Sequence, residues 1–229
     1  TLRAVVDVNT RLGRCGVEPG APAVELAKAI VDADGLEFAG LMTYEGRVFE
    51  EDADALAGES RKWIQQVLDT RQDIEKVGID VETVSVGGTY NYEIASEMDG
   101  VTEVPAGMYA LMDGRYALYR PEFQPAAHVL AIVVSAPEPG VAIMDAGQKA
   151  IGADTEQPTV ENIPGATVRS LSAEHGNLVL SNGDVSVGDK VWVLPWDVGL
   201  TFNLHDYAQV VRDGRLEAVW ELPARGRFR

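Results

Sequence analysis

Cysteine, basic residues and long apolar runs are all scarce in this sequence, and each shortage excludes a class of protein. One cysteine, Cys15, rules out an internal disulfide framework, so we expect a reducing, cytoplasmic location. Nineteen basic residues stand against 36 acidic ones, and the formal net charge of -17 disfavours nucleic acid and anionic membrane surfaces as partners. No apolar run approaches the roughly 20 residues that span a bilayer, so we expect no membrane segment.

The first half of the chain alternates strand-like and helix-like segments. Apolar strand-like runs occupy residues 2–8, 36–44, 81–86 and 108–112. Between them, apolar side chains recur at helical spacing over about residues 22–31 and 51–77. This alternation predicts β/α units, and we expect the C-terminal half of a (β/α)8 barrel of the TIM type. Because such a barrel needs eight strands and Thr1 leads directly into a strand-like run, we expect the chain to begin partway through the barrel.

The second half is rich in short strand-like runs. Turn signals such as Asn182-Gly183, Gly188-Asp189 and Asp213-Gly214 separate these runs after about residue 121. We therefore predict an α/β domain over residues 1–120, followed by an all-β domain over residues 121–229.

Polar and glycine residues lie at or just beyond the ends of the first three predicted strands, and a glycine opens the fourth. Arg14 lies in DVNTRLGRCGV and Tyr44 in GLMTYEG, while the pair Gly88 and Thr89 lies in SVGGTYNY and Gly107 in EVPAGMYALMD. Each residue alone has an ordinary interpretation, as a surface charge, a half-buried tyrosine or a turn residue. Four consecutive strand ends with compatible groups nevertheless favour a site at the catalytic edge of a barrel, where backbone N–H groups of a Gly-Gly-Thr turn can cradle a phosphate.

These four segments, together with IMDAGQKAIGAD, SAEHG, NLHD and the terminal ARGR, resemble a known family in order and spacing. The chain is similar over essentially its whole length to the D-threonine aldolase and D-serine dehydratase family, which has the alanine-racemase-like fold of type III pyridoxal-phosphate enzymes. The resemblance implies a barrel that binds pyridoxal 5′-phosphate, a D-serine dehydratase-like β-domain and a head-to-tail homodimer. It also implies that Arg14 faces the phenolic oxygen of the cofactor and that Tyr44 lies near the pyridine ring. The residues that it places around the phosphate are Gly88, Thr89, Gly107, Met108 and Tyr109.

One departure from the family concerns the lysine that forms a Schiff base with the cofactor. The resemblance places this lysine near the end of the first barrel strand, upstream of the present chain. No lysine of the chain occupies a matching position; the five are Lys28, Lys62, Lys76, Lys149 and Lys190. We therefore expect the chain alone to be inactive.

A second departure concerns a metal and an acid/base group. Family members usually carry P-x-H-x-C/D-x-T, whereas this chain reads PWDVGLT, so only Asp197 remains to bind manganese or zinc and Gly199 has no ligand atom. An ordinary polar loop residue is at least as good an interpretation of Asp197. Glu50, in EGRVFEED, is a candidate acid/base group near a position where aldolases of the family use histidine, although the acidic start of a helix also explains it.

The resemblance implies a lyase of small β-hydroxy D-amino acids, which either cleaves the substrate to glycine and an aldehyde or removes water. A metal-independent amino-acid racemase is the first alternative, because proton transfer at Cα needs only the cofactor and acid/base groups. A protein that binds pyridoxal phosphate without catalysis is the second.

Overall fold

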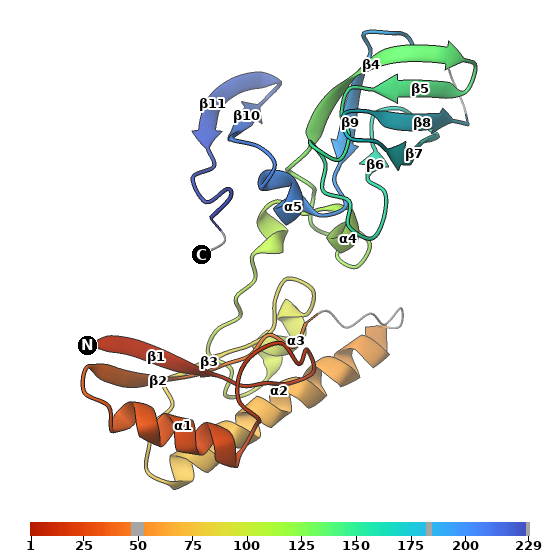
Figure 1. Cartoon of the computed structure of the whole chain (residues 1–229). Helices are drawn as coiled ribbons and strands as arrows, with labels where there is room; N and C mark the ends of the chain where they lie inside the picture. Colours follow the sequence, from red (N-terminus) through yellow and green to blue (C-terminus); the bar gives the residue numbers. More distant parts are fainter. Residues whose placement is uncertain (47–52, 182–184, 228–229) are drawn as a thin grey trace. The chain divides into compact units, whose positions relative to one another are not determined.

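The computed structural model describes residues 1–46, 53–181 and 185–227 (Figure 1). Contacts divide the chain into two units, Thr1–Met108 and Tyr109–Arg229. The boundary predicted after residue 120 lies between two elements of the second unit and stays a prediction. Among the described helices, none is both long and apolar enough to cross a membrane.

The first unit is a three-stranded parallel sheet with helices. Its elements are β1 (Leu2–Asp7), α1 (Ala21–Val31), β2 (Leu36–Met42), α2 (Ala53–Lys76), β3 (Thr83–Ser85) and α3 (Tyr92–Glu97). The strand order is β1-β2-β3, and both neighbouring pairs are parallel. The predicted alternation of strands and helices is confirmed for these three strands and the two long helices between them.

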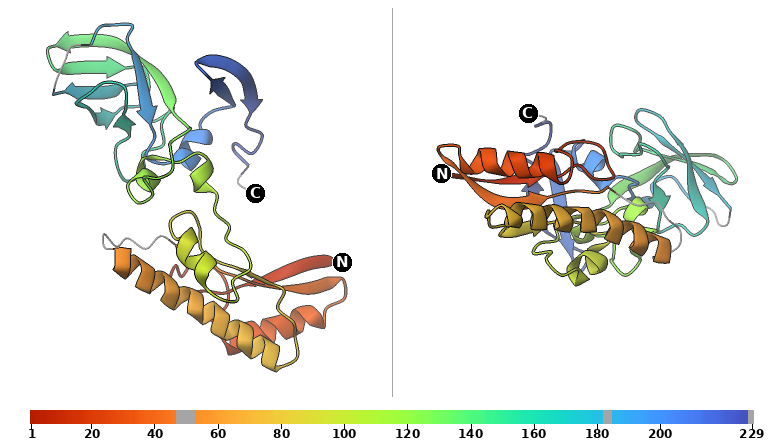
Figure 2. Two further views of the ribbon diagram at one scale, coloured as in Figure 1. Left: turned by 180° about the vertical axis from the view of Figure 1, so that it is seen from behind. Right: turned by 90° about the horizontal axis from the view of Figure 1, so that it is seen from below.

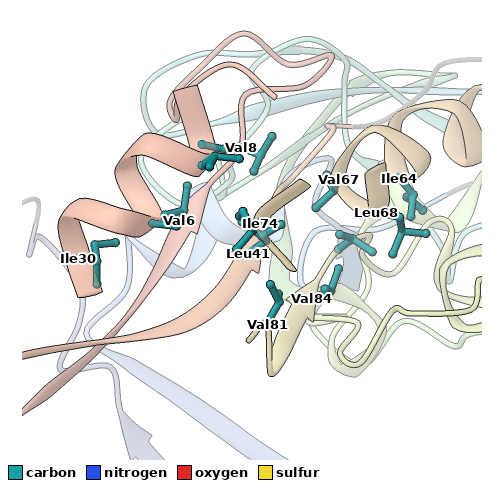
Figure 3. Close-up of a cluster of buried hydrophobic side chains, with 14 of the residues drawn as sticks. Val6, Val8, Ile30, Leu41, Ile64, Val67, Leu68, Ile74, Val81 and Val84 are labelled. Carbon is teal, nitrogen blue, oxygen red and sulfur yellow. The ribbon is translucent and has the colours of Figure 1, made fainter. Parts of the chain in front are cut away.

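Helices α1 and α2 pack on one face of this sheet (Figure 1). Pro22 is the second residue of α1 and lies in its first turn, where the missing N–H costs nothing. The buried stripe of α2 contains the predicted residues Ile64, Val67, Leu68 and Ile74 at helical spacing. Figure 3 shows how these side chains meet those of Val6, Leu41 and Val84, which lie in the strands, and that of Val8, directly after β1. One buried apolar layer therefore fixes the sheet against both helices.

The predicted fourth strand, residues 108–112, is wrong. Met108–Ala110 forms a short 3-10 helix, η1. Met112 has φ 56°, a left-handed conformation that interrupts extended backbone. Pairing with β3 in this region consists of a parallel bridge between Ser85 and Glu103, and Pro105 has no N–H to continue a ladder.

The second unit is mainly antiparallel β-structure. Its elements are α4 (Gly114–Ala117), β4 (Val129–Glu138), β5 (Val141–Met144), β6 (Thr159–Val160), β7 (Ala166–Leu171), β8 (Gly176–Leu180), β9 (Lys190–Leu194), α5 (Val198–Phe202), β10 (Tyr207–Arg212) and β11 (Arg215–Glu221). Six strands form one sheet in the order β6-β9-β4-β5-β8-β7, and its edge strands β6 and β7 also contact each other. The sheet thus nearly closes into a barrel around its own apolar core (Figures 1 and 2). The prediction of a β-rich second half is confirmed, with the short helices α4 and α5 added.

Candidate functional site

Three loops leave the C-terminal ends of β1, β2 and β3 at one edge of the parallel sheet. The final residues of the three strands, Asp7, Met42 and Ser85, stand in register there. The hydroxyl of Thr43, directly after β2, donates to the carbonyl oxygen of Val8 at 2.8 Å. The loop after β1 is therefore tied to β2 at the edge where parallel β/α sheets place their ligands.

Predicted site residues from three different loops meet at this edge. The guanidinium carbon of Arg14 lies 5.5 Å from the centroid of the Tyr44 ring, within range of a cation–π contact. A Cβ atom built on Gly88 would lie 3.6 Å from Cε2 of Tyr44, at ordinary contact distance. Thr89 follows directly and is buried. The structure thus brings together Arg14, Tyr44 and the Gly88–Thr89 turn of the first unit, as predicted.

Two buried side chains beneath this turn were not predicted as site residues. Glu45 and Asn91 have no exposed surface, and Asn91 Nδ2 donates to Glu45 Oε1 at 2.6 Å. The other end of the same amide, Asn91 Oδ1, accepts the N–H of Gly88 at 3.0 Å. Within the described residues, Glu45 Oε2 has no hydrogen-bond partner. The available sequence signal was a carboxylate directly after the predicted strand-like run 36–44, a place where full burial demands a partner.

The other residues predicted to surround the cofactor phosphate, Gly107, Met108 and Tyr109, follow the bridge between Ser85 and Glu103. Ser85 Oγ donates to Glu103 Oε1 at 2.6 Å, which holds this segment beside β3. Apart from Gly107 itself and its two chain neighbours, no described residue has a heavy atom within 4 Å of a Cβ built on Gly107, so its surroundings are open. Met108 begins η1. Tyr109 is the first residue of the second unit and is half exposed. Glu50, the predicted acid/base group, lies outside the described residues.

Asp197 lies in the second unit and already has a structural role. It caps α5, because its Oδ1 accepts the N–H of Leu200 at 2.8 Å. Its Oδ2 lies 3.8 Å from Nη2 of Arg115. In the part of the chain that the structure describes, no group of three or more His, Cys, Asp or Glu side chains could hold a metal ion. The donors around Asp197 therefore do not fit a divalent metal.

Asp113 joins the two short helices of the second unit. Its carboxylate accepts the N–H of Tyr116 at 2.8 Å, which caps α4, and the N–H of Val198 at 3.3 Å, in the first turn of α5. Burial raises the pKa of Asp113 above its ordinary value, although both N–H bonds oppose this shift. The protonated form of Asp113 is therefore favoured more than that of an exposed aspartate.

The three lysines of the first unit lie on its helices and form ion pairs there. Lys28, on α1, pairs with Glu25 at 2.8 Å, and Lys76, on α2, pairs with Asp73 at the same distance. Lys62, also on α2, pairs with Glu59 at 3.4 Å. Lys149 and Lys190 belong to the second unit and are exposed.

Two family models match the chain. The alanine racemase N-terminal domain matches residues 1–113, and the putative serine dehydratase domain matches residues 126–211. A D-threonine aldolase from Arthrobacter sp. is 36% identical over 98% of the chain.

The chain belongs to the D-threonine aldolase and D-serine dehydratase family. Among solved structures, a D-threonine aldolase from Filomicrobium marinum matches with a TM-score of 0.95 and 34% identity, covering 100% of this chain and 64% of that one. The D-threo-3-hydroxyaspartate dehydratase from Delftia sp. matches with a TM-score of 0.77 and 26% identity over 96% of this chain and 65% of that one. A 3-hydroxy-D-aspartate aldolase from Paracoccus denitrificans is 33% identical over 99% of the chain. The chain spans 61% of the length of both aldolases matched by sequence. The predicted family and its alanine-racemase-like fold are confirmed.

Proposed function

We propose that the intact protein is a pyridoxal-phosphate-dependent lyase of small β-hydroxy D-amino acids, which cleaves or dehydrates its substrate. The observation that carries this proposal is the similarity to a D-threonine aldolase over the whole chain, at 34% identity and a TM-score of 0.95. The names of the other relatives agree with it, since 3-hydroxyaspartate and threonine both carry a hydroxyl group on Cβ. In this proposal the first unit is the C-terminal half of a (β/α)8 barrel, and the protein is a cytoplasmic homodimer.

The residues at the strand ends fit the cofactor. Gly88 and Gly107 leave room for a ligand. The three atoms nearest to a Cβ on Gly88 belong to tyrosine rings at ordinary distance, and a Cβ on Gly107 meets no described residue within 4 Å beyond its chain neighbours. Backbone N–H groups of these segments and the Thr89 hydroxyl would hold the phosphate. Tyr44 would lie beside the pyridine ring, and Arg14 would offer a positive charge to the phenolic oxygen. When bound, the cofactor supplies an electron sink for the charge released as a bond at Cα breaks.

The buried pair Glu45 and Asn91 would position the phosphate-binding turn. Asn91 accepts the Gly88 N–H and donates to Glu45 with the two ends of one amide. This arrangement fixes the direction of the Gly88 peptide before any ligand arrives, so less ordering remains for binding. We therefore assign Glu45 and Asn91 as positioning residues.

No lysine of this chain is assigned as the lysine that forms the Schiff base with the cofactor. The lysines on α1 and α2 are engaged in surface ion pairs, which supports the expectation that none of them is the Schiff-base lysine. We expect the 229-residue chain, incubated with pyridoxal phosphate and treated with borohydride, to yield no stable covalent adduct. An adduct mapped to Lys149 would overturn this expectation.

Racemisation at Cα is the second candidate function. One observation favours it, namely that the donors around Asp197 do not fit the metal that in family members engages the β-oxygen of the substrate. Racemisation needs no polarised β-oxygen, whereas cleavage and dehydration both act on that group.

The experiment follows products rather than substrate loss. The intact protein is incubated with D-threonine, D-serine and 3-hydroxy-D-aspartate, and aldehyde or 2-oxo acid, ammonia and optical rotation are measured in parallel. We expect aldehyde, or 2-oxo acid together with ammonia. Loss of optical rotation without these products would establish the racemase instead, and no change in any readout would refute both activities.

A further inference from the structure

Positions 197 and 199 face the same small volume at the start of α5. Asp197 holds its Oδ1 toward the helix N-terminus, where it accepts the N–H of Leu200. A Cβ atom built on Gly199 would lie 3.3 Å from that same oxygen. Side chains at these two positions would thus converge, which is the geometry that two ligands of one ion require. In this chain Gly199 contributes no ligand atom, so the pair is incomplete.

The cation beside this incomplete pair is Arg115, on α4. Its Nη2 lies 2.6 Å from Asp154 Oδ1 and 3.8 Å from Asp197 Oδ2, so one guanidinium group serves two carboxylates. The side chain is only 15% exposed. The guanidinium carbon also lies 5.7 Å from the centroid of the Trp196 ring. Arg115 is therefore held in place by anions and by an aromatic ring.

The surrounding backbone fixes this arrangement further. Gly114 N, one residue before Arg115, donates to the carbonyl oxygen of Pro195 at 2.9 Å. Trp196 Nε1 donates to Thr155 Oγ1 at 2.7 Å, and this hydroxyl also lies 3.3 Å from Arg115 Nη2. The segments that carry Arg115, Asp154 and Asp197 are thus cross-linked by hydrogen bonds.

We propose that Arg115 is a built-in cation that supplies, beside Asp197, the positive charge that a divalent metal held by positions 197 and 199 would otherwise supply. A guanidinium stays protonated at every physiological pH and cannot dissociate from the chain, so it keeps a positive charge beside Asp197 without a bound ion. A divalent cation at the same place would be repelled by the positive charge of Arg115. It would find one ligand, Asp197, because Gly199 has no ligand atom. The chain therefore does not bind manganese or zinc at this position. This inference rests on the geometry and on the family pattern, and it holds whichever reaction the intact protein catalyses.

The test is a cycle of four proteins: the unchanged chain, Arg115→Met, the double variant Asp197→His/Gly199→Cys, and the triple variant that combines them. The double variant restores the ligand pair of the family pattern, and Arg115→Met removes the charge while keeping a long side chain. Zinc binding is measured by competition with a chromophoric chelator and by metal analysis after gel filtration. We expect the triple variant to bind one zinc ion at least tenfold more tightly than the double variant. We expect the unchanged chain and Arg115→Met to bind none in stoichiometric amount.

Three results would overturn the inference. Stoichiometric zinc or manganese in the unchanged chain would show that Arg115 does not replace a metal. Equal zinc affinity of the double and triple variants would show that the guanidinium does not occupy the ion's place. No zinc in the triple variant would show that positions 197 and 199 do not converge on an ion.

The fold of each variant is checked by circular dichroism. Arg115→Gln takes the place of Arg115→Met if the methionine variant does not fold. Arg169→Met, at an exposed arginine on β7 of the same unit, is the matched control. Combined with the double variant, it is expected to leave zinc affinity unchanged, because it removes a positive charge at a different place.

Discussion

Replacement of Asn91 by alanine tests whether the buried pair beneath the Gly88 turn stabilises the first unit. The substitution removes the bond to the Glu45 carboxylate, at 2.6 Å, and the bond from the Gly88 N–H, at 3.0 Å. A bond to a charged group contributes about 1.5–3 kcal/mol and a neutral bond about 0.5–1.5 kcal/mol. Because the fully buried Glu45 carboxylate would then have no hydrogen-bond partner among the described residues, we expect Asn91→Ala to lower the free energy of unfolding by about 2–4 kcal/mol.

Urea denaturation followed at 222 nm measures this loss, because α1 and α2, the two longest described helices, belong to the first unit. With a urea dependence of about 1.5–2 kcal/mol per molar, a loss of 3 kcal/mol lowers the midpoint by about 1.5–2 M. Glu45→Gln is the matched control, since a glutamine oxygen still accepts from Asn91 and no carboxylate remains buried. We expect it to change stability by less than about 1 kcal/mol, and the double variant to be more stable than Asn91→Ala. A change below about 0.5 kcal/mol for Asn91→Ala, or an equal loss for Glu45→Gln, would refute the reasoning.

Three further outcomes are expected. Gly107→Val should leave the stability of the chain unchanged, since no described atom lies within 4 Å of the new Cβ, but should weaken cofactor binding to the intact protein at least tenfold in a fluorescence titration. The principal activity of the intact protein should survive exhaustive chelation, and its loss on chelation with recovery on adding manganese would contradict this. Burial raises the pKa of Asp113, so the folded chain binds this proton more tightly than the unfolded chain. Stability therefore falls as pH rises from the ordinary aspartate pKa through the raised value, and Asp113→Asn should abolish that fall in urea titrations at several pH values.

Local sequence patterns were sufficient to predict much of the first unit. Alternation of apolar runs with helical spacing identified β1, β2, β3 and the two long helices, because both patterns reflect burial on one face. The same pattern gave a wrong prediction at residues 108–112, where an apolar composition typical of a strand belongs to a short 3-10 helix and the residues after it. A methionine side chain gives no indication of a left-handed backbone, so the conformation of Met112 could not be predicted from the sequence.

The candidate site was predictable where a residue follows its own strand. Arg14, Tyr44 and Gly88 were placed together because parallel strands end at the same edge of a sheet. The bond between Glu45 and Asn91 joins residues 46 positions apart, and no local spacing reports such a pairing. Asp197 and Arg115 are likewise distant in sequence, so the charge beside Asp197 became visible only in the fold.

Each unit of the chain encloses its own buried cluster, and the two clusters share no residue. Substitutions at sites with no shared partners usually add in their effects on stability. A weakening change such as one at Leu41 in the first cluster therefore leaves the packing around Leu178 in the second intact. We therefore expect each unit to have its own margin of stability, against which substitutions in its own cluster accumulate.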